Sequence, residues 1–410
     1  MKKIAIIGAG PAGIFAAINA NKDKNNEVYV FDKNNKIGKK LFITGKGRCN
    51  VTNSAPIDEF INQVVRNPYF MYSSFYSFTN IQLIELMNEY GLKLKEERGG
   101  RMFPVSDKSS DVIKVLENLS KDFKVNINLN EEIKKIGKNE FGKFLVISEI
   151  NTYEFDKVII ATGGNTYMST GSTGFGYKVA KDFGHNIINP IPALVPMKIK
   201  DDFISELEGT SLRNVELIVE VKNKEKYREF GEMLFTKNGI SGPIVLTLSS
   251  FIGRIPKKDI KLFIDFKPAL DYDRLDKRIL RDFSENLNRD IINSLDELLI
   301  KKSIPLILEK AGIEERKKVH QISKEERNKL VETIKKFELK YDGLEDINRG
   351  IITNGGVDVN EVDPSTMESK IVKGLYFAGE VLDIDALTGG FNLQVAYSTG
   401  YLAGINAGGE

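Results

Sequence analysis

The chain has 410 residues, 41% of them hydrophobic, and 59 Lys and Arg nearly balance 57 Asp and Glu. This length predicts two or three domains, and the even charge argues against nucleic acid or an anionic membrane as the main partner. A single cysteine, Cys49, excludes an internal disulfide and a two-cysteine redox relay, while His185 and His320 are too few for a typical zinc site. We therefore expect a cytoplasmic protein without a bound metal.

The N-terminal sequence KIAIIGAGPAG predicts a buried strand at 3–7, a glycine-rich turn and a helix at 11–22. Two lysines before an apolar run also resemble a secretory signal. Gly8, Gly10 and Gly13, however, have the spacing that a phosphate-binding loop requires. We therefore interpret the segment as the start of a βαβ unit.

The pattern GxGxxG gives each of its three glycines a role. Gly8 permits the tight turn, Gly10 leaves room for a pyrophosphate, and Gly13 lets the helix pack closely on the strand. The helix N-terminus directs backbone N–H groups at the phosphates. Asp32, at the end of a strand expected at 27–31, has the position of a carboxylate that binds an adenosine ribose. This unit predicts a bound dinucleotide, either NAD or FAD.

The segment after this unit reads as alternating helices and strands. Helical patterns lie at 57–66, 80–91 and 109–121, and Ser109 or Ser110 is the expected cap of the last. Strand patterns follow at 124–128, 131–137, 143–150 and 153–161. Pro190, Pro192 and Pro196 then predict a stiff connection.

Beyond the prolines the pattern changes before the strands of the first domain return. Strands are expected at 215–221 and 260–266, around a helical stretch at 242–252, and residues 274–336 read as highly charged helices. The later expected elements are strands at 337–341, 348–353 and 373–380 and a helix at 392–405. A short parallel strand needs neighbours, so the strand at 373–380 is expected to rejoin the N-terminal sheet.

The C-terminal segment favours FAD over NAD. Gly379 and Glu380 follow a buried strand, where a glycine and an acidic residue meet the flavin ribitol in FAD enzymes. Gly389 and Gly390 then lead into the last helix, whose positive N-terminal end suits the negative charge of a reduced flavin.

Two further glycine-rich segments have residue types that suit contact with a dinucleotide. The loop TGKGRCNVTN at 44–53 combines backbone freedom with fixed charge and short polar side chains. Thr162 and Gly163 lie in ATGG at a strand end, where glycines allow close approach of the cofactor. The following loop, 170–176, is a weaker candidate for NAD(P)H because no strand directly precedes it.

Motifs spread from residue 4 to residue 404 resemble the aminoacetone oxidase family of FAD-binding enzymes, also described as bile-acid-reductase-like NAD(P)/FAD-dependent oxidoreductases. The matching stretches include IAIIGAGPAG, FITGKGRCNVTN, GGRMFPVSDKSSDVI, ATGGNTYMSTGSTGFGYKVAKDFGH and GLYFAGEVLDIDALTGGFNLQVAYSTGYLAG. The resemblance implies FAD contacts at Gly8, Gly10, Ala12, Gly13, Asp32, Lys40, Gly47, Arg48, Asn50, Ile133, Glu380, Asn392 and Leu393. The chain departs from the family at Phe175, where relatives often carry Asp, and at Ala386-Leu387, which could alter the substrate cavity.

The resemblance also implies a Rossmann-like α/β FAD-binding domain, of the two-dinucleotide-binding flavoprotein type, split by an inserted β-barrel and a helical subdomain. The expected limits are 1–193 and 353–410 for the FAD-binding domain, 194–272 and 337–352 for the barrel, and 273–336 for the helices. These limits agree with the order of strand and helix patterns in the sequence.

Flavin-mediated hydride transfer to or from a small carbonyl-conjugated molecule is the expected activity, with NADH or NADPH as the donor in C=C reduction. The alternatives are an O₂-using oxidase of a small amine or amino ketone and a flavin-binding sensor without turnover. An RNA-modifying flavoprotein is disfavoured by the balanced charge. Arg48, Arg101 and Tyr167 are weak catalytic candidates, since an arginine can polarise a carbonyl. For Cys49 a buried core position is favoured over a reactive thiolate. The sequence leaves the oligomeric state open.

Overall fold

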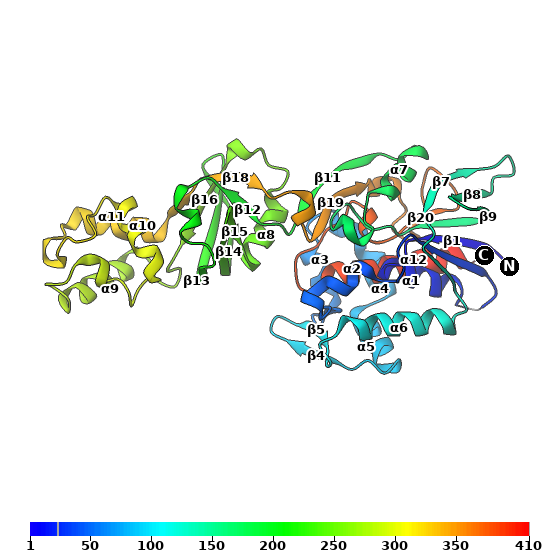
Figure 1. Ribbon diagram of the computed structural model, residues 1–410, viewed down its shortest axis with the longest axis horizontal. Coiled ribbons are helices and arrows are strands. Elements are labelled where there is room, and N and C mark those ends of the chain that lie inside the picture. Colours follow the sequence, from blue (N-terminus) through cyan, green and yellow to red (C-terminus); the bar gives the residue numbers. More distant parts are fainter. Residues whose placement is uncertain (23, 410) are drawn as a thin grey trace. The chain divides into compact units, whose positions relative to one another are not determined.

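The computed structural model describes residues 1–22 and 24–409 and divides into two compact units (Figure 1). The first unit comprises Met1–Ala193 and Ile347–Glu410, and the second comprises Leu194–Asp346. Within the described residues, no helix has both the length and the hydropathy of a membrane span.

A five-stranded parallel sheet forms the centre of the first unit, in the order β20-β10-β1-β2-β6. Its strands are β1 (Lys3–Ile7), β2 (Glu27–Asp32), β6 (Asn126–Leu129), β10 (Lys157–Ile160) and β20 (Leu375–Phe377). The C-terminal strand therefore does rejoin the N-terminal sheet, as predicted. All five carboxyl ends lie at one edge, which is where open parallel sheets bind their ligands.

Three smaller sheets surround this centre. Their strands are β3 (Thr52–Asn53), β4 (Leu94–Glu97) and β5 (Arg101–Pro104); β7 (Ile133–Lys138), β8 (Phe144–Ser148) and β9 (Thr152–Phe155); and β11 (Ile187–Ala193) with β19 (Ile352–Val357). The helices of the unit are α1 (Pro11–Ala20), α2 (Lys39–Ile43), α3 (Ile57–Gln63), α4 (Tyr72–Ser77), α5 (Asn80–Glu89), α6 (Ser109–Asp122), α7 (Phe175–Asp182) and α12 (Phe391–Gly408).

The first and last helices of the unit, α1 and α12, pack with almost no side chain between them. A Cβ atom added at Gly400, Gly404 or Gly408 would lie 2.3 to 2.4 Å from a carbonyl oxygen of α1. The oxygens belong to Ala12, Ala16 and Ala20, respectively. Because real Cβ atoms do not approach backbone so closely, only glycine permits this helix separation. The four-residue spacing places all three glycines on one face of α12.

The second unit contains a seven-stranded antiparallel sheet in the order β17-β16-β13-β14-β15-β12-β18. Its strands are β12 (Met197–Ile199), β13 (Ser211–Val221), β14 (Lys224–Thr236), β15 (Gly239–Ser241), β16 (Ile260–Asp265), β17 (Phe337–Leu339) and β18 (Tyr341–Leu344). The two ends of this order, β17 and β18, are separated in the chain by Lys340 alone. The sheet must therefore curl round until its edges meet, which gives it a barrel-like form.

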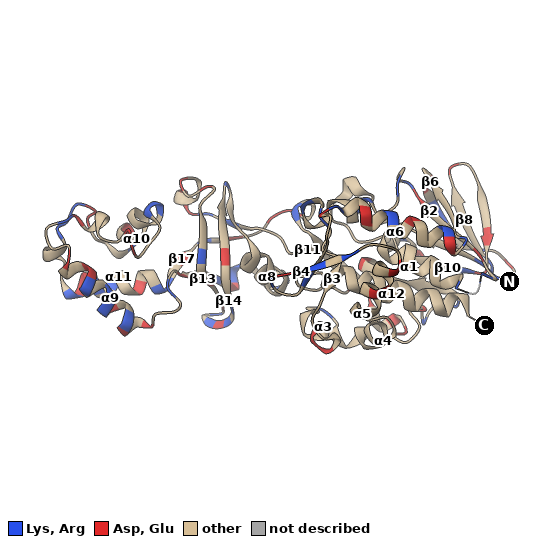
Figure 2. Ribbon diagram, turned by 90° about the horizontal axis from the view of Figure 1, so that it is seen from below, with Lys and Arg blue, Asp and Glu red and all other residues tan. Residues whose placement is uncertain are grey.

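Four helices complete the second unit: α8 (Pro243–Ile252), α9 (Tyr272–Ser284), α10 (Ile304–Ala311) and α11 (Lys324–Lys335). Acidic and basic residues are interspersed on α9 and α11, as expected for solvated helix faces (Figure 2). A buried ion pair joins α11 to the sheet, since Lys335 Nζ lies 2.6 Å from Asp265. The same ammonium group donates to the carbonyl oxygens of Lys267 and Leu270, so its charge is well compensated.

Three local predictions were wrong. The hydroxyl of Ser109 does not cap α6 but donates to the carbonyl oxygen of Phe42 at 2.8 Å, and Lys108 occupies the cap position. Pro190 and Pro192 lie within strand β11 rather than in a connection. They are tolerated because β11 pairs on one side only and its register shifts beside Pro190. The strand expected at 348–353 begins only at Ile352, after a short 3₁₀ turn.

The α1–α12 contact predicts a large cost for a side chain at Gly404. Gly404→Val should lower the free energy of unfolding by about 1–3 kcal/mol, because α12 must move away from α1. Gly137→Ala is the control, since a Cβ there meets no atom within 4 Å. Chemical denaturation of both variants measures the difference, and equal stability would contradict the close packing.

Candidate functional site

The glycine loop at the end of β1 is shaped by its own backbone contacts. Gly8 has φ +110°, and a Cβ there would lie 2.4 Å from the carbonyl oxygen of Ala161. A Cβ at Gly13 would lie 1.8 Å from the carbonyl oxygen of Gly8. At Gly10, the residue before α1, a Cβ would meet nothing within 4 Å. Gly8 and Gly13 are thus required by packing, whereas Gly10 faces open space at the helix N-terminus, where a pyrophosphate fits.

Asp32 holds this loop in place from the end of β2. Its Oδ2 accepts a hydrogen bond from the backbone N–H of Ala9 at 2.8 Å, and its Oδ1 accepts one from Asn34, also at 2.8 Å. The backbone N–H of Glu131 donates to the Asp32 carbonyl oxygen at 3.0 Å, two residues before Ile133. The structure therefore brings the predicted adenosine-binding positions Asp32 and Ile133 onto neighbouring segments.

The ATGG segment packs directly against the glycine loop. Ala161 contacts the Gly8 turn, and Thr162 follows in the same loop after β10. Gly163 has φ +72°, and a Cβ there would lie 3.0 Å from the hydroxyl of Ser172. Phe175, the departure from the family pattern, packs against the hydrophobic core of this unit. The segment thus supports the dinucleotide loop from the side of β10.

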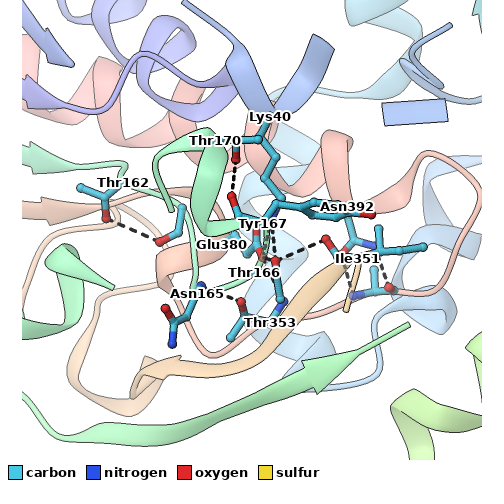
Figure 3. Close-up of polar contacts among 12 residues, drawn as sticks. Lys40, Thr162, Asn165, Thr166, Tyr167, Thr170, Ile351, Thr353, Glu380 and Asn392 are labelled. Atoms are coloured by element: carbon cyan, nitrogen blue, oxygen red, sulfur yellow. Dashed lines mark hydrogen bonds and ion pairs between the residues drawn. The ribbon is translucent and has the colours of Figure 1, made fainter. Parts of the chain in front are cut away.

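Lys40 and Glu380, both predicted cofactor residues, form an ion pair of 2.7 Å between α2 and the turn after β20 (Figure 3). Lys40 also donates to the hydroxyl of Thr166 at 2.8 Å. Glu380 accepts a hydrogen bond from the backbone N–H of Thr353 at 2.9 Å. Each charged side chain is about one-fifth exposed, so the pair is partly screened from water.

Sequence reasoning missed Thr166 and Thr353, which tie four distant segments together at this pair. The hydroxyl of Thr353 accepts a hydrogen bond from the N–H of Asn165 at 2.8 Å. A Cβ at Gly164 would lie only 2.3 Å from that hydroxyl oxygen. The second glycine of ATGG therefore signals a close partner, although the sequence does not say which residue it is.

The loop at 44–53 meets the N-terminus of α12. Gly390 has φ +103°, and a Cβ there would lie 2.4 Å from the backbone of Thr52. The Asn53 amide donates to the carbonyl oxygens of Gly389 at 3.0 Å and Gly99 at 2.9 Å. Asn53, a residue not predicted as a site residue, thus fixes the glycine turn before α12 beside the β4–β5 hairpin.

Asn392, Leu393 and Gly379 are three further positions predicted to contact FAD. Asn392 exchanges two hydrogen bonds with the backbone of Ala386, at 2.7 and 2.9 Å, so its amide braces the loop before α12. Leu393, next on α12, is half-buried. Gly379 has φ +77°, and a Cβ there would lie 2.8 Å from the Cβ of Ala12, so it too is required by packing.

Two features of the 44–53 loop fit a flavin. The Oδ1 atom of Asn50 is buried and has no hydrogen-bond partner among the described residues, so a donor from a bound group would satisfy it. Gly47 has φ +83°, and no atom lies within 4 Å of a Cβ added there. Together with the open space at Gly10, these positions are suited to the flavin end and the pyrophosphate of FAD.

The three weak catalytic candidates lie in two places. Arg48 forms ion pairs with Glu97 and with Asp107, the latter at 2.8 Å, and its guanidinium lies 4.1 Å from the ring centre of Phe103. The hydrogen bonds to Glu97 and Asp107 raise the pKa of Arg48. Arg101 lies 5.8 Å from the same ring and is exposed.

Tyr167 follows Thr166 in the loop after β10. It has φ +51°, and the Lys40 ammonium lies 5.9 Å from its ring centre. The structure therefore places Tyr167 beside the Lys40–Glu380 pair.

Cys49 is part of the 44–53 loop but is fully buried. Burial raises the pKa of its thiol to about 12, so almost none of it is thiolate near neutral pH. This agrees with the core position favoured from the sequence.

Cys49 should therefore resist thiol reagents while the protein is folded. At pH 8, about one thiol in ten thousand is ionised if the pKa is about 12. Labelling with a chromogenic disulfide should be absent in native protein and complete in denaturant. Rapid labelling of the native protein would contradict the burial.

Two glycine variants separate folding from cofactor binding. Gly10→Val should leave the stability of the FAD-free protein within about 0.5 kcal/mol but weaken FAD binding at least about tenfold, because the side chain enters the open space. Gly13→Ala should lower both the stability of the FAD-free protein and its affinity for FAD, since its Cβ meets the Gly8 carbonyl. Thermal unfolding and titration with FAD measure the two effects. Normal FAD binding by Gly10→Val would place the pyrophosphate elsewhere.

Comparison with known proteins identifies the family of the chain. A family model described as the Rossmann domain of HI0933-like proteins matches residues 2–406. The chain is 32% identical over 412 residues to a 3-dehydro-bile acid delta(4,6)-reductase of Clostridium scindens, covering 98% of each chain. It is 30% identical over 405 residues to a ribosomal RNA dihydrouridine synthase of Escherichia coli, covering 97% of this chain and 95% of that one.

A solved structure shares the fold alone. The 3-ketosteroid delta1-dehydrogenase of Sterolibacterium denitrificans aligns over the whole of both chains with a TM-score of 0.50 at 13% identity. The match over nearly all residues, together with the whole-chain relatives, settles the family. The chain belongs to the HI0933-like family, and it is an FAD-dependent oxidoreductase.

Proposed function

We propose that this enzyme reduces a carbon–carbon double bond conjugated to a carbonyl group, with NADH or NADPH as the electron donor. The observation that carries the proposal is the chemistry shared by its whole-chain relatives. A 3-dehydro-bile acid with Δ4,6 unsaturation contains a double bond next to a ketone. Dihydrouridine is uridine whose ring double bond, next to a carbonyl, has been reduced. The substrates differ greatly in size, but the bond that changes is of one kind.

The site has features that support this reaction. Bound FAD would supply the hydride carrier, so the protein has to position groups and stabilise charge. The N-terminus of α12, an eighteen-residue helix, has its positive dipole end at Gly390. A helix end stabilises developing negative charge by up to about 2 kcal/mol in partly buried geometry.

The substrate is the open part of the proposal. A small molecule is the first candidate, in line with the sequence-based expectation. A uracil base in ribosomal RNA is the second candidate, favoured by whole-chain relatives of that activity from Escherichia coli and Haemophilus influenzae. A formal net charge of +2 does not by itself decide between them, since a basic patch can be local.

Anaerobic spectroscopy tests the reaction in two steps. NADH or NADPH should bleach the visible absorbance of the bound flavin within seconds. Adding a 3-oxo-4,6-diene steroid acid, or uridine-containing ribosomal RNA, should then restore the absorbance without oxygen. The FAD-free protein controls for direct reduction of the substrate by the nucleotide.

The outcomes separate the alternatives. Bleaching by a small amine or amino ketone, with no response to either nucleotide, would replace the reductase by an O₂-using oxidase. No response to any donor would favour a flavin-binding sensor.

A further inference from the structure

We infer that the tip of the β4–β5 hairpin, Arg98 to Arg101, forms with Lys46 a binding site for an anionic group of the substrate, beside the flavin ring. This inference rests on the proposed function. It adds to it the residues that hold the substrate at a distance from the bond that reacts.

The hairpin tip is held rigidly at the N-terminus of α12. Gly99 and Gly100 have φ of +79° and +71° and form the turn. The amide of Asn53 donates to the Gly99 carbonyl at 2.9 Å and to the Gly389 carbonyl at 3.0 Å. The backbone N–H of Ser54 donates to the Gly100 carbonyl at 2.7 Å. The tip is thus fixed one residue from the glycine that begins α12.

Lys46 is tied to the same place through the aromatic ring of Phe103. A Cβ at the neighbouring Gly45 would lie 3.3 Å from that ring, so the loop rests on it. Arg48 and Arg101 both lie within 6 Å of the ring centre. Lys46 itself has φ +58° and an exposed side chain. The backbone next to Lys46 and the guanidinium groups of Arg48 and Arg101 therefore lie around one aromatic ring.

These basic residues differ in whether their charge is already compensated. Arg48 is paired with Glu97 and Asp107, and Lys95 also pairs with Asp107. Within the described part of the chain, Lys46 and Arg98 have no carboxylate within ion-pair distance.

Arg101 is only weakly compensated. Its nearest carboxylate oxygen, on Glu97, is 4.0 Å away, and its Nε donates to the Arg98 carbonyl. All three of Lys46, Arg98 and Arg101 are exposed. The chain is almost neutral overall, but it has a local excess of positive charge at the hairpin tip and Lys46.

An arginine pair with a nearby lysine recognises carboxylates and phosphodiesters by charge-assisted hydrogen bonds. Both candidate substrates carry such a group at a distance from the reacting double bond: a bile acid has a side-chain carboxylate, and RNA has phosphodiesters. The structure therefore assigns the common chemistry, an anionic anchor, and the two sources are separated by experiment.

The test uses the FAD-loaded enzyme in its oxidised form, so that binding is measured without turnover. Variants are Arg98→Gln, Arg101→Gln and Lys46→Gln, singly and combined, with Arg98→Lys as the charge-conserving variant. Lys373→Gln is the matched control, because Lys373 is an exposed lysine before β20, at the opposite, amino end of the parallel sheet.

In the small-molecule arm, changes in the flavin absorbance report the Kd of a 3-oxo-4,6-diene steroid acid and of its uncharged methyl ester. The acid should bind the unaltered enzyme about tenfold more tightly than the ester, and the triple variant should lose this preference. Arg98→Lys should keep most of it. In turnover, KM should rise while kcat is retained.

In the RNA arm, fluorescence anisotropy reports binding of a labelled uracil-containing ribosomal RNA fragment at several salt concentrations. Each removed cation should reduce the slope of log Kd against log salt by about one. If the variants lose only the preference for the acid over its ester, the anionic group of the substrate is a carboxylate. If they lose the dependence of RNA affinity on salt concentration, the site binds phosphodiesters.

The inference is overturned if the triple variant shows the same preference for the acid over the ester, and the same salt dependence of RNA binding, as Lys373→Gln. It is also overturned if the triple variant loses affinity for FAD, because the tip would then bind the cofactor. Failure of the proposed function gives a different result: the flavin would not be reoxidised by either substrate, whatever the variants do to binding.

Discussion

The contact between α1 and α12 sets the geometry of the whole flavin site. The two helices run parallel, with Gly400 opposite Ala12, so α12 extends about eight residues beyond the start of α1. At 1.5 Å per residue, their N-termini are offset by about 12 Å along the axis. One positive helix end therefore lies at the pyrophosphate position and the other at the position expected for the flavin ring. Side chains at the three glycines would destroy this registration.

Electrostatics at the site are local and do not follow the overall composition. Lys40 and Glu380 compensate each other where four segments meet. Arg48 is likewise compensated by two carboxylates, whereas Arg98 and Lys46 are not, within the described residues. The near-zero net charge of the chain argues against a nucleic-acid partner, but it does not report the local positive charge of Lys46, Arg98 and Arg101.

The sequence predicted what depends on nearby residues. The glycine loop and Asp32 are confirmed as one structural unit because strand, turn and helix patterns are encoded within about thirty residues. Thr353 was not found, nor was the partner of Asn53 in the predicted 44–53 loop, because these contacts join segments that are far apart in the chain. Ser109 was misread because a tertiary acceptor, the Phe42 carbonyl, outcompeted the local cap. The spacing of Gly400, Gly404 and Gly408 was visible, but its partner helix was not.

The split of the first unit has a consequence for synthesis on the ribosome. Domains tend to fold as they emerge, N-terminal parts first. Here β1 and α1 emerge early, but β20, which pairs with β10, and α12, which packs on α1, follow the inserted unit in the chain. The inserted unit, Leu194–Asp346, has its own hydrophobic core and can form in the interval. The FAD-binding sheet and the α1–α12 contact are therefore completed only after the inserted unit has been made.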